Sequence, residues 1–154
     1  MPKVSVTIVT FNQEDLIEET IASVLSQSYQ DFEVIVADDC STDGTCAASE
    51  RALSGSRVPW QIISQERNGG VTVNTAAAVA AASGKYIAFL GGDDTWDPDK
   101  LETCVKLLDE DDRVSLVGHA MRYMDGNGRF NGQAQKSVTT KAAVDWRELL
   151  LGRR

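Results

Sequence analysis

The clearest structural signal in the sequence is Phe32-Glu33-Val34-Ile35-Val36-Ala37-Asp38-Asp39-Cys40-Ser41-Thr42-Asp43. Its first half is almost entirely apolar, which is typical of a strand buried on both faces of a parallel sheet. Its second half is acidic and polar, as in loops that lead from a strand into a helix, and Ser41 or Asp43 can cap that helix. The segment therefore predicts an α/β fold with carboxylates at the carboxyl end of a buried strand.

The same change from apolar strand to polar loop recurs on both sides of this segment. Apolar and β-branched runs predict further strands at 4–9, 60–64, 86–90 and 114–123. Apolar residues at helical spacing predict helices over about 12–27, 41–53, 71–82 and 97–108, the first of them capped by Asn12. Strands that alternate with helices indicate βαβ units, and hence a mainly parallel sheet with helices on both faces.

Beyond residue 124 the pattern is weaker. Asp125-Gly126-Asn127-Gly128 predicts a turn, and Val144 to Leu151 predicts a short helix. Trp146 and the leucines at 149–151 give that helix an apolar surface, which favours self-association into a homo-oligomer where no other segment covers it. Because there is no internal repeat or linker, we expect residues 1–154 to form a single domain with its core at 1–126.

The composition excludes several classes of protein. The chain has 154 residues, with 15 Lys and Arg against 23 Asp and Glu and a formal net charge of −8, whereas nucleic-acid binding draws on clustered basic residues. No apolar run approaches the roughly 20 residues of a membrane span, and the first residues resemble a strand rather than a signal peptide. Three cysteines without a CxxC motif predict neither a disulfide framework nor a zinc site. We expect a cytoplasmic protein with no nucleic-acid partner and no membrane span.

Polar residues follow three of the predicted strands, at Thr10-Phe11-Asn12, Asp38-Asp39 and Gly91-Gly92-Asp93-Asp94. In parallel sheets, ligands bind beyond the carboxyl ends of the strands. Two acidic pairs at one edge repel each other, and Mg²⁺ or Mn²⁺ with a phosphate ligand removes that cost. The alternative is that the aspartates are only turn and capping residues.

Two glycine-containing segments allow the same two interpretations. Asn68-Gly69-Gly70 is either a simple turn or an anion cradle at the start of the next helix. Gly91-Gly92 either ends a strand or lets a ligand approach the backbone closely.

Taken in order, these motifs resemble the family 2 glycosyltransferases, which have the GT-A fold, a Rossmann-like sheet flanked by helices. The resemblance covers residues 4 to about 126 and rests on the order and spacing of several segments. They are 4–12 (VSVTIVTFN), 23–28 (SVLSQS), 32–43 (FEVIVADDCSTD), 68–70 (NGG), Asn74, 83–87 (SGKYI) and 93–101 (DDTWDPDKL).

The resemblance implies an enzyme that transfers a sugar from a nucleotide-sugar donor to a hydroxyl acceptor, such as a saccharide, with inversion at the anomeric carbon. UDP is the commonest nucleotide by family analogy. By resemblance, Thr10, Phe11 and Asn12 line the nucleotide pocket, Asp39 faces the base, and Asp38 supports the same loop.

The remaining donor-site residues also come from the resemblance. Asn68, Gly70 and Asn74 match a segment that closes the donor side of the pocket. Asp93 and Asp94 fall at the DxD metal motif of the family, where Mn²⁺ or Mg²⁺ bridges the donor diphosphate and acts as a Lewis acid on the leaving group. Asp93 therefore counts both as a donor-binding residue and as a metal ligand.

The sequence departs from the family pattern at three points. Gly91 stands where the acidic motif often begins with Asp, and Val73 stands where Arg often precedes the position of Asn74. Family members also continue into an acceptor-binding half that carries the catalytic base, so the base is expected beyond Arg154 and 127–154 is expected to be the start of that half. The chain by itself is therefore not expected to transfer sugar.

Two other α/β classes share the alternating pattern. A nicotinamide enzyme needs a GxGxxG turn after its first strand, and Thr10-Phe11-Asn12 contains no glycine. A phosphate-accepting receiver domain also binds Mg²⁺ with acidic residues, but its acidic pair follows the first strand, whereas the pairs here follow the second and fourth. A non-catalytic nucleotide-binding or scaffold domain with the same fold is the third alternative.

Overall fold

The computed structural model describes residues 1–125 and 129–135. The chain divides into two compact units, of which the first is Met1–Glu102 and the second begins at Thr103. Among the described residues, no helix is long and apolar enough to cross a lipid bilayer.

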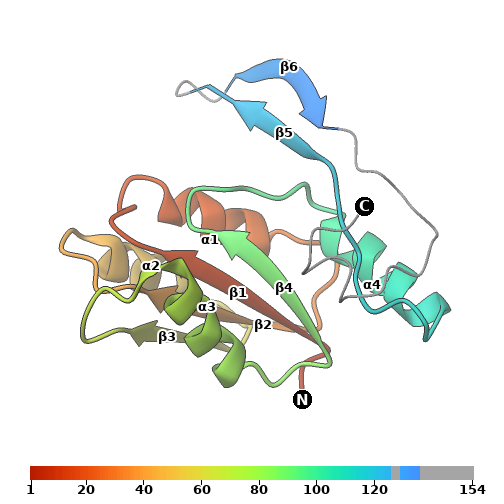
Figure 1. The fold of residues 1–154 in the computed structure, drawn as a ribbon, viewed down its shortest axis with the longest axis horizontal. Coiled ribbons are helices and arrows are strands. Elements are labelled where there is room, and N and C mark those ends of the chain that lie inside the picture. The colour runs from red at the N-terminus through yellow and green to blue at the C-terminus, as the bar shows by residue number, and fades with distance from the viewer. Residues whose placement is uncertain (126–128, 136–154) are drawn as a thin grey trace. The chain divides into compact units, whose positions relative to one another are not determined.

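The first unit contains a four-stranded parallel sheet in the order β3-β2-β1-β4 (Figure 1). Its elements in chain order are β1 (Val4–Thr10), α1 (Ile17–Leu25), β2 (Phe32–Asp38), α2 (Thr45–Leu53), β3 (Trp60–Ser64), α3 (Gly70–Ala81) and β4 (Tyr86–Gly91), followed by α4 (Lys100–Glu110), which crosses the unit boundary. The prediction of a mainly parallel α/β sheet is confirmed, and the four strands begin and end within a residue of their predicted positions.

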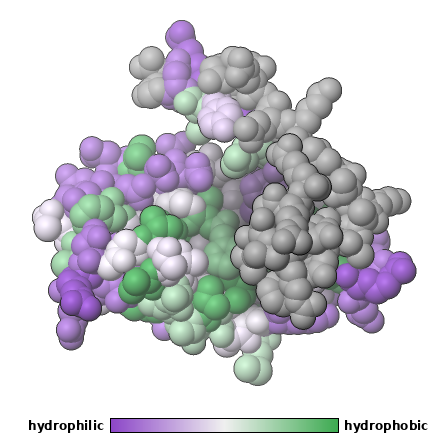
Figure 2. All heavy atoms as spheres, viewed as in Figure 1, coloured by the Kyte–Doolittle hydropathy of each residue, from purple (hydrophilic) through white to green (hydrophobic). Residues whose placement is uncertain are grey.

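α3 covers one face of the sheet. Ala78 of α3 packs with Ile35 and Ala37 of β2, and Val9 and Ile63 join this cluster from β1 and β3. Figure 1 shows α3 lying across the front of β1 and β2. Side chains on α3 that point away from the sheet include exposed valines, and Figure 2 shows hydrophobic residues gathered over α3 and β4.

α1 and α2 cover the other face. Successive side chains of a strand point to opposite faces, so the alternate residues of β1 and β2 form a second core. Its fully buried members are Val6, Ile8, Val34 and Val36 on the strands and Ile17, Ile21 and Val24 on α1. α1 also packs directly on α2. Helices on both faces agree with the βαβ pattern predicted from the sequence.

A buried glutamine ties the loop after β4 to the end of α1. Gln27 donates from Nε2 to the carbonyl oxygen of Asp97 at 2.9 Å and accepts from the backbone N–H of Leu101 at 2.9 Å. Trp96 is buried in the same loop, and the Lys100 Nζ lies 3.4 Å from the centre of its ring. These contacts hold the C-terminal end of the acidic loop that follows β4.

The first helix begins later than the sequence predicts. α1 starts at Ile17 with Leu16 at its N-cap, so the prediction that Asn12 caps it is wrong. Asn12 instead adopts a left-handed backbone conformation, with φ of 51°. Its side chain accepts a hydrogen bond from the backbone of Thr42 in another loop, which sequence spacing along one helix could not reveal.

The second unit also differs in part from its prediction. The predicted strand at 114–123 is present only from Met121, as β5 (Met121–Met124), which pairs antiparallel with β6 (Phe130–Gln135). The backbone N–H of Asp125 donates to the carbonyl of Arg129 at 2.9 Å, where a turn was predicted. Residues 126–128 of that turn and the predicted helix at 144–151 lie outside the described residues.

Candidate functional site

The carboxyl ends of β1, β2 and β4 meet at one edge of the sheet. Thr10 is paired with Asp38 in the register of β1 and β2. The backbone N–H of Asp39 donates to the carbonyl of Thr10 at 3.0 Å, and that of Gly92 donates to the carbonyl of Val9 at 2.9 Å. The three segments that the sequence selected therefore leave the sheet side by side.

The segment after β1 is held by the loop that follows β2. Asn12 accepts from the backbone N–H of Thr42 at 2.8 Å, and its own N–H donates to Ser41 Oγ at 2.8 Å. Thr10 is buried and its hydroxyl donates to Gln13 Oε1. Phe11 stands between them with 44% of its surface exposed. An exposed aromatic ring between two hydrogen-bonded neighbours is available to stack on a flat ligand group.

Asp38 shapes the loop after β2. Its side chain is only 1% exposed and accepts hydrogen bonds from the backbone N–H and the hydroxyl of Ser41. The Asp38 carboxylate thus accepts locally from the residue three positions on and closes the loop. Cys40, inside this loop, has a left-handed backbone with φ of 65°.

Asp39 connects the same loop to the start of α3. Its two carboxylate oxygens accept the backbone N–H groups of Gly69 and Gly70, each at 2.8 Å, and the residue is only 4% exposed. Gly70 has φ of 80°, a conformation that L side chains rarely adopt. The carboxylate therefore caps a helix whose first N–H groups have no partner within the helix.

A pocket of about 690 Å³ lies between the end of β3 and α3. It is lined by Gln65, Glu66, Arg67, Asn68, Gly69 and Val73. Asn68 and Gly69 were selected from the sequence as part of a turn or cradle, and the capping carboxylate of Asp39 reaches the backbone at the pocket's rim. The pocket and the acidic strand end thus belong to one site.

Asn74 lies beneath this site rather than on its surface. It is 2% exposed, and its Nδ2 donates to the carbonyl of Ala37 at 2.7 Å and lies 3.5 Å from that of Thr10. The structure therefore places Asn74 under the strand ends with its amide directed at their carbonyls, and Asn74 is not among the residues that line the pocket.

Asp93 and Asp94 form an exposed acidic turn after β4. The backbone N–H of Asp94 donates to the carbonyl of Gly91 at 3.2 Å. A Cβ built on Gly91 would lie 3.0 Å from Asp93 Oδ1 and 3.3 Å from Asp94 Oδ2, so both carboxylates approach the same point. Among the described residues, no group of three or more His, Cys, Asp or Glu side chains forms a metal cluster. The turn offers two hard oxygen donors of the kind that Mg²⁺ and Mn²⁺ accept.

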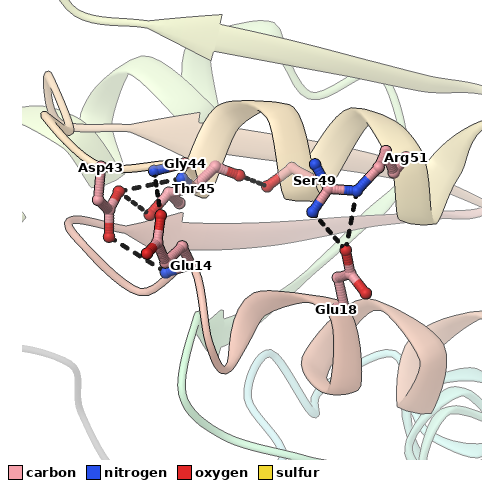
Figure 3. A network of polar contacts seen from close by, with 7 residues as sticks. All are labelled: Glu14, Glu18, Asp43, Gly44, Thr45, Ser49 and Arg51. Atoms are coloured by element: carbon pink, nitrogen blue, oxygen red, sulfur yellow. Dashed lines mark hydrogen bonds and ion pairs between the residues drawn. The ribbon is translucent and has the colours of Figure 1, made fainter.

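A second set of acidic contacts joins the loops after β1 and β2 (Figure 3), and of its two acids the sequence had singled out only Asp43, as a possible helix cap. Glu14 accepts from the backbone N–H of Gly44 at the start of α2, while Asp43 accepts from the backbone N–H of Glu14 and from Thr45. The hydrogen bond from the Thr45 hydroxyl is the main reason that the pKa of Asp43 lies below its usual value. Both acids are therefore committed to holding the two loops together.

Arg67 is the functional candidate that the motif comparison missed. It is the only Lys or Arg in the four segments that follow β1 to β4 (11–16, 39–44, 65–69 and 92–97), and it lines the pocket. Those segments otherwise carry several acids. The charges of the four segments would have revealed Arg67 from the sequence alone. A single cation among acidic residues at strand ends suits an anionic or carbonyl-rich ligand.

Comparison with known proteins identifies the family. The model of glycosyl transferase family 2 matches residues 5–151. This chain belongs to the family 2 glycosyltransferases, and its sheet and helices are those of the GT-A fold.

Curated relatives include TuaG of Bacillus subtilis (strain 168), whose name assigns it provisionally to teichuronic acid biosynthesis as a glycosyltransferase. It is 37% identical over 127 residues, which cover 81% of this chain and 50% of that protein. Chondroitin synthase of Pasteurella multocida (strain Pm70) is 34% identical over 128 residues, which cover 83% of this chain and 13% of that protein. The chain spans about half the length of the first relatives that it matches.

Solved structures with the same fold contain nucleotides. S. aureus TarS 1–349 in complex with UDP is 32% identical with a TM-score of 0.66, over 70% of this chain and 32% of that one. The mannosyltransferase PcManGT from Pyrobaculum calidifontis, in complex with GDP-Man and Mn²⁺, is 30% identical with a TM-score of 0.66, over 70% of this chain and 32% of that one.

Proposed function

We propose that this chain binds a nucleotide-sugar donor, a UDP-sugar, for inverting transfer of the sugar to a hydroxyl acceptor. The observation that carries the proposal is the convergence of Thr10–Asn12, Asp38–Asp39 and Asp93–Asp94 at adjacent parallel strand ends, next to the pocket at 65–69. Similar structures hold UDP and GDP-Man, which supports a nucleotide as the ligand of this edge.

The strand order suggests how the donor lies. Neighbouring strands are about 4.8 Å apart, so the pocket after β3 and the acidic turn after β4 are separated by three strand spacings, roughly the length of a nucleoside diphosphate. The base then lies toward Asp39 and the pocket, where Phe11 offers an aromatic face. The diphosphate lies toward Asp93 and Asp94.

A divalent cation fits the acidic turn. Two carboxylates that approach one point beside Gly91 provide hard oxygen ligands, and Mg²⁺ or Mn²⁺ is typically held by one or two carboxylates together with substrate phosphates. Asp93 and Asp94 would hold the ion, which supplies positive charge for the leaving diphosphate. Without it, the acidic loops would repel the donor.

Titration calorimetry with UDP, in the presence and absence of Mn²⁺, tests this proposal. We expect Mn²⁺ to bind weakly to the free chain and more tightly once UDP is present, because the phosphates complete its coordination. Asp93→Asn and Asp94→Asn should each weaken this linkage. Asp31→Asn, the same change on an exposed residue at the opposite end of the sheet, is the matched control. Metal affinity that is independent of UDP would contradict the site.

A non-catalytic nucleotide-binding domain would pass the same binding test. The two functions separate in an assay of the full-length protein with UDP-sugars, Mn²⁺ and a panel of saccharide acceptors. Acceptor-dependent glycoside product supports a transferase, and nucleotide binding without product supports a binding or scaffold domain.

A further inference from the structure

The buried amide of Asn74 joins the N-terminal half of α3 to the ends of two strands. Its Nδ2 donates to the carbonyl of Ala37 on β2 at 2.7 Å and lies 3.5 Å from the carbonyl of Thr10 on β1. The Thr10 carbonyl also accepts the backbone N–H of Asp39 at 3.0 Å, so a side-chain donor here adds to the backbone hydrogen bonding at the strand ends. Asn74 provides that donor from a helix.

The start of α3 is held from a second direction by Asp39. The carboxylate accepts the N–H groups of Gly69 and Gly70, immediately before and at the first residue of the helix. The segment that lines the pocket, 65–69, therefore runs between β3 and a helix whose position both side chains determine. A shift of α3 by one ångström would change the shape of the pocket directly.

Two buried polar atoms at this junction have no hydrogen-bond partner among the described residues. They are Asn74 Oδ1 and Gln65 Nε2. Gln65 directly follows β3 and lines the pocket together with Gly69 and Val73 at the start of α3. A buried amide that served stability alone would be expected to bond both of its polar atoms. In natural proteins, buried polar atoms without a hydrogen-bond partner occur mainly at functional sites, because leaving them unpaired costs stability.

We infer that Asn74 is a positioning residue for the donor site, which acts by fixing α3 and the pocket segment 65–69 on the ends of β1 and β2. The inference rests on the proposed function in taking the ligand of this pocket to be a nucleoside diphosphate. Asn74 does not touch that ligand, since it lies beneath the site and spends its donor group on backbone carbonyls.

The first test compares Asn74→Ala with Ser5→Ala. Ser5 is a matched control because it is fully buried and its hydroxyl bonds Glu33 and the N–H of Gly84 at the opposite end of the sheet. In Asn74→Ala we expect hydrogen exchange at the amides of Gly69 and Gly70 to be about tenfold faster, the effect of one lost hydrogen bond. UDP affinity should fall by about the same factor, and Ser5→Ala should show neither change.

The second test uses Asn74→Asp, which is isosteric but lacks the N–H donor when ionised. Burial raises the pKa of a carboxyl group, and the protonated form can donate to the carbonyl of Ala37 again. UDP affinity of this variant, relative to the wild-type chain at each pH, should therefore recover as the pH falls from about 8 to about 5.5. Asn74→Ala should show no such recovery.

Unchanged exchange at Gly69 and Gly70 in Asn74→Ala, or an equal loss of UDP affinity in Ser5→Ala, would overturn the inference. A flat pH profile for Asn74→Asp, relative to wild type, would also contradict it. If the wild-type chain bound no nucleoside diphosphate, the proposed function would fail instead. The exchange rates would then still decide whether Asn74 fixes the segment at 65–69.

Discussion

Within residues 1–125 and 129–135, two residues other than glycine adopt left-handed backbone conformations, and both lie at the candidate site. Asn12 follows β1 and Cys40 follows β2. Such conformations cost about 1–3 kcal/mol each and persist where surrounding contacts over-determine the backbone. Here the contacts are the hydrogen bond from Thr42 to Asn12 and the hydrogen bonds from Ser41 to Asp38. Backbone strain is therefore concentrated where the ligand is proposed to bind.

Asp39→Ala should weaken both the fold and the binding of UDP. Removing the carboxylate leaves the N–H groups of Gly69 and Gly70 without their acceptor and removes a charged hydrogen-bond partner for the base. Each effect is about 1–3 kcal/mol. Calorimetry and urea denaturation measure the two losses, with Asp31→Ala as the control. UDP binding as tight as in the parent chain would show that Asp39 has only the capping role.

At the scale of elements, the segments that leave β1 and β4 are packed against each other closely enough to exclude extra atoms. A Cβ at Gly92 would lie 2.8 Å from the Cβ and Oγ1 of Thr10 and would also meet Gln13. Gly92→Ala should therefore destabilise the chain by about 1–3 kcal/mol, the usual cost of overpacking. Gly118→Ala is the control, because a Cβ there meets nothing within 4 Å. Equal midpoints of urea denaturation for the two variants would contradict this packing.

The opposite end of the sheet has a pH-sensitive contact. Burial raises the pKa of Glu33, but hydrogen bonds from Ser5 and Ser83 outweigh it and hold the pKa below its usual 4.5. A lowered pKa means that the ionised form stabilises the fold above pH 4.5, and that this contribution is lost as the pH falls through the folded-state value.

Unfolding free energy measured against pH should therefore decline more steeply below pH 4.5 in the wild-type chain than in Glu33→Gln. Glu50→Gln, a change on the exposed surface of α2, should keep the wild-type slope. A Glu33→Gln curve parallel to that of the wild type would exclude this contact as a source of acid sensitivity.

At the scale of the whole molecule, ligand binding and stability are linked. Every residue proposed to touch the donor lies in the unit Met1–Glu102, so UDP should stabilise that unit against unfolding. With Mn²⁺ present, free UDP at 100 times its dissociation constant should add about 2.7 kcal/mol. This should raise the Tm of the unit by several degrees in a calorimetric scan. Inorganic phosphate at equal ionic strength is the control, and an equal shift with phosphate would indicate a general salt effect.

The strands of the first unit and the place of the candidate site were predictable from the sequence. Buried parallel strands have continuous apolar sequences, such as Phe32–Ala37, because both of their faces pack against helices. The carboxyl ends of such strands lie at one edge by topology alone, so Thr10, Asp38 and Asp93 could be grouped without coordinates. The family 2 motifs depend on the same order and spacing, and for this reason the family was recognisable as well.

Tertiary structure alone decided what each polar side chain at this edge bonds. Asn12 is a residue type that often caps helices, yet its side-chain oxygen accepts a hydrogen bond from the N–H of Thr42, 30 residues away in the sequence. Asp39 accepts hydrogen bonds from the start of α3 rather than from its own loop. The Asn74 amide donates to the carbonyl of Ala37 and is not directed into the pocket. The local sequence pattern predicts which side chains are polar and which are buried. The partner of a short polar side chain depends on which loops the packed sheet brings within about 3 Å, and that is a property of the folded chain.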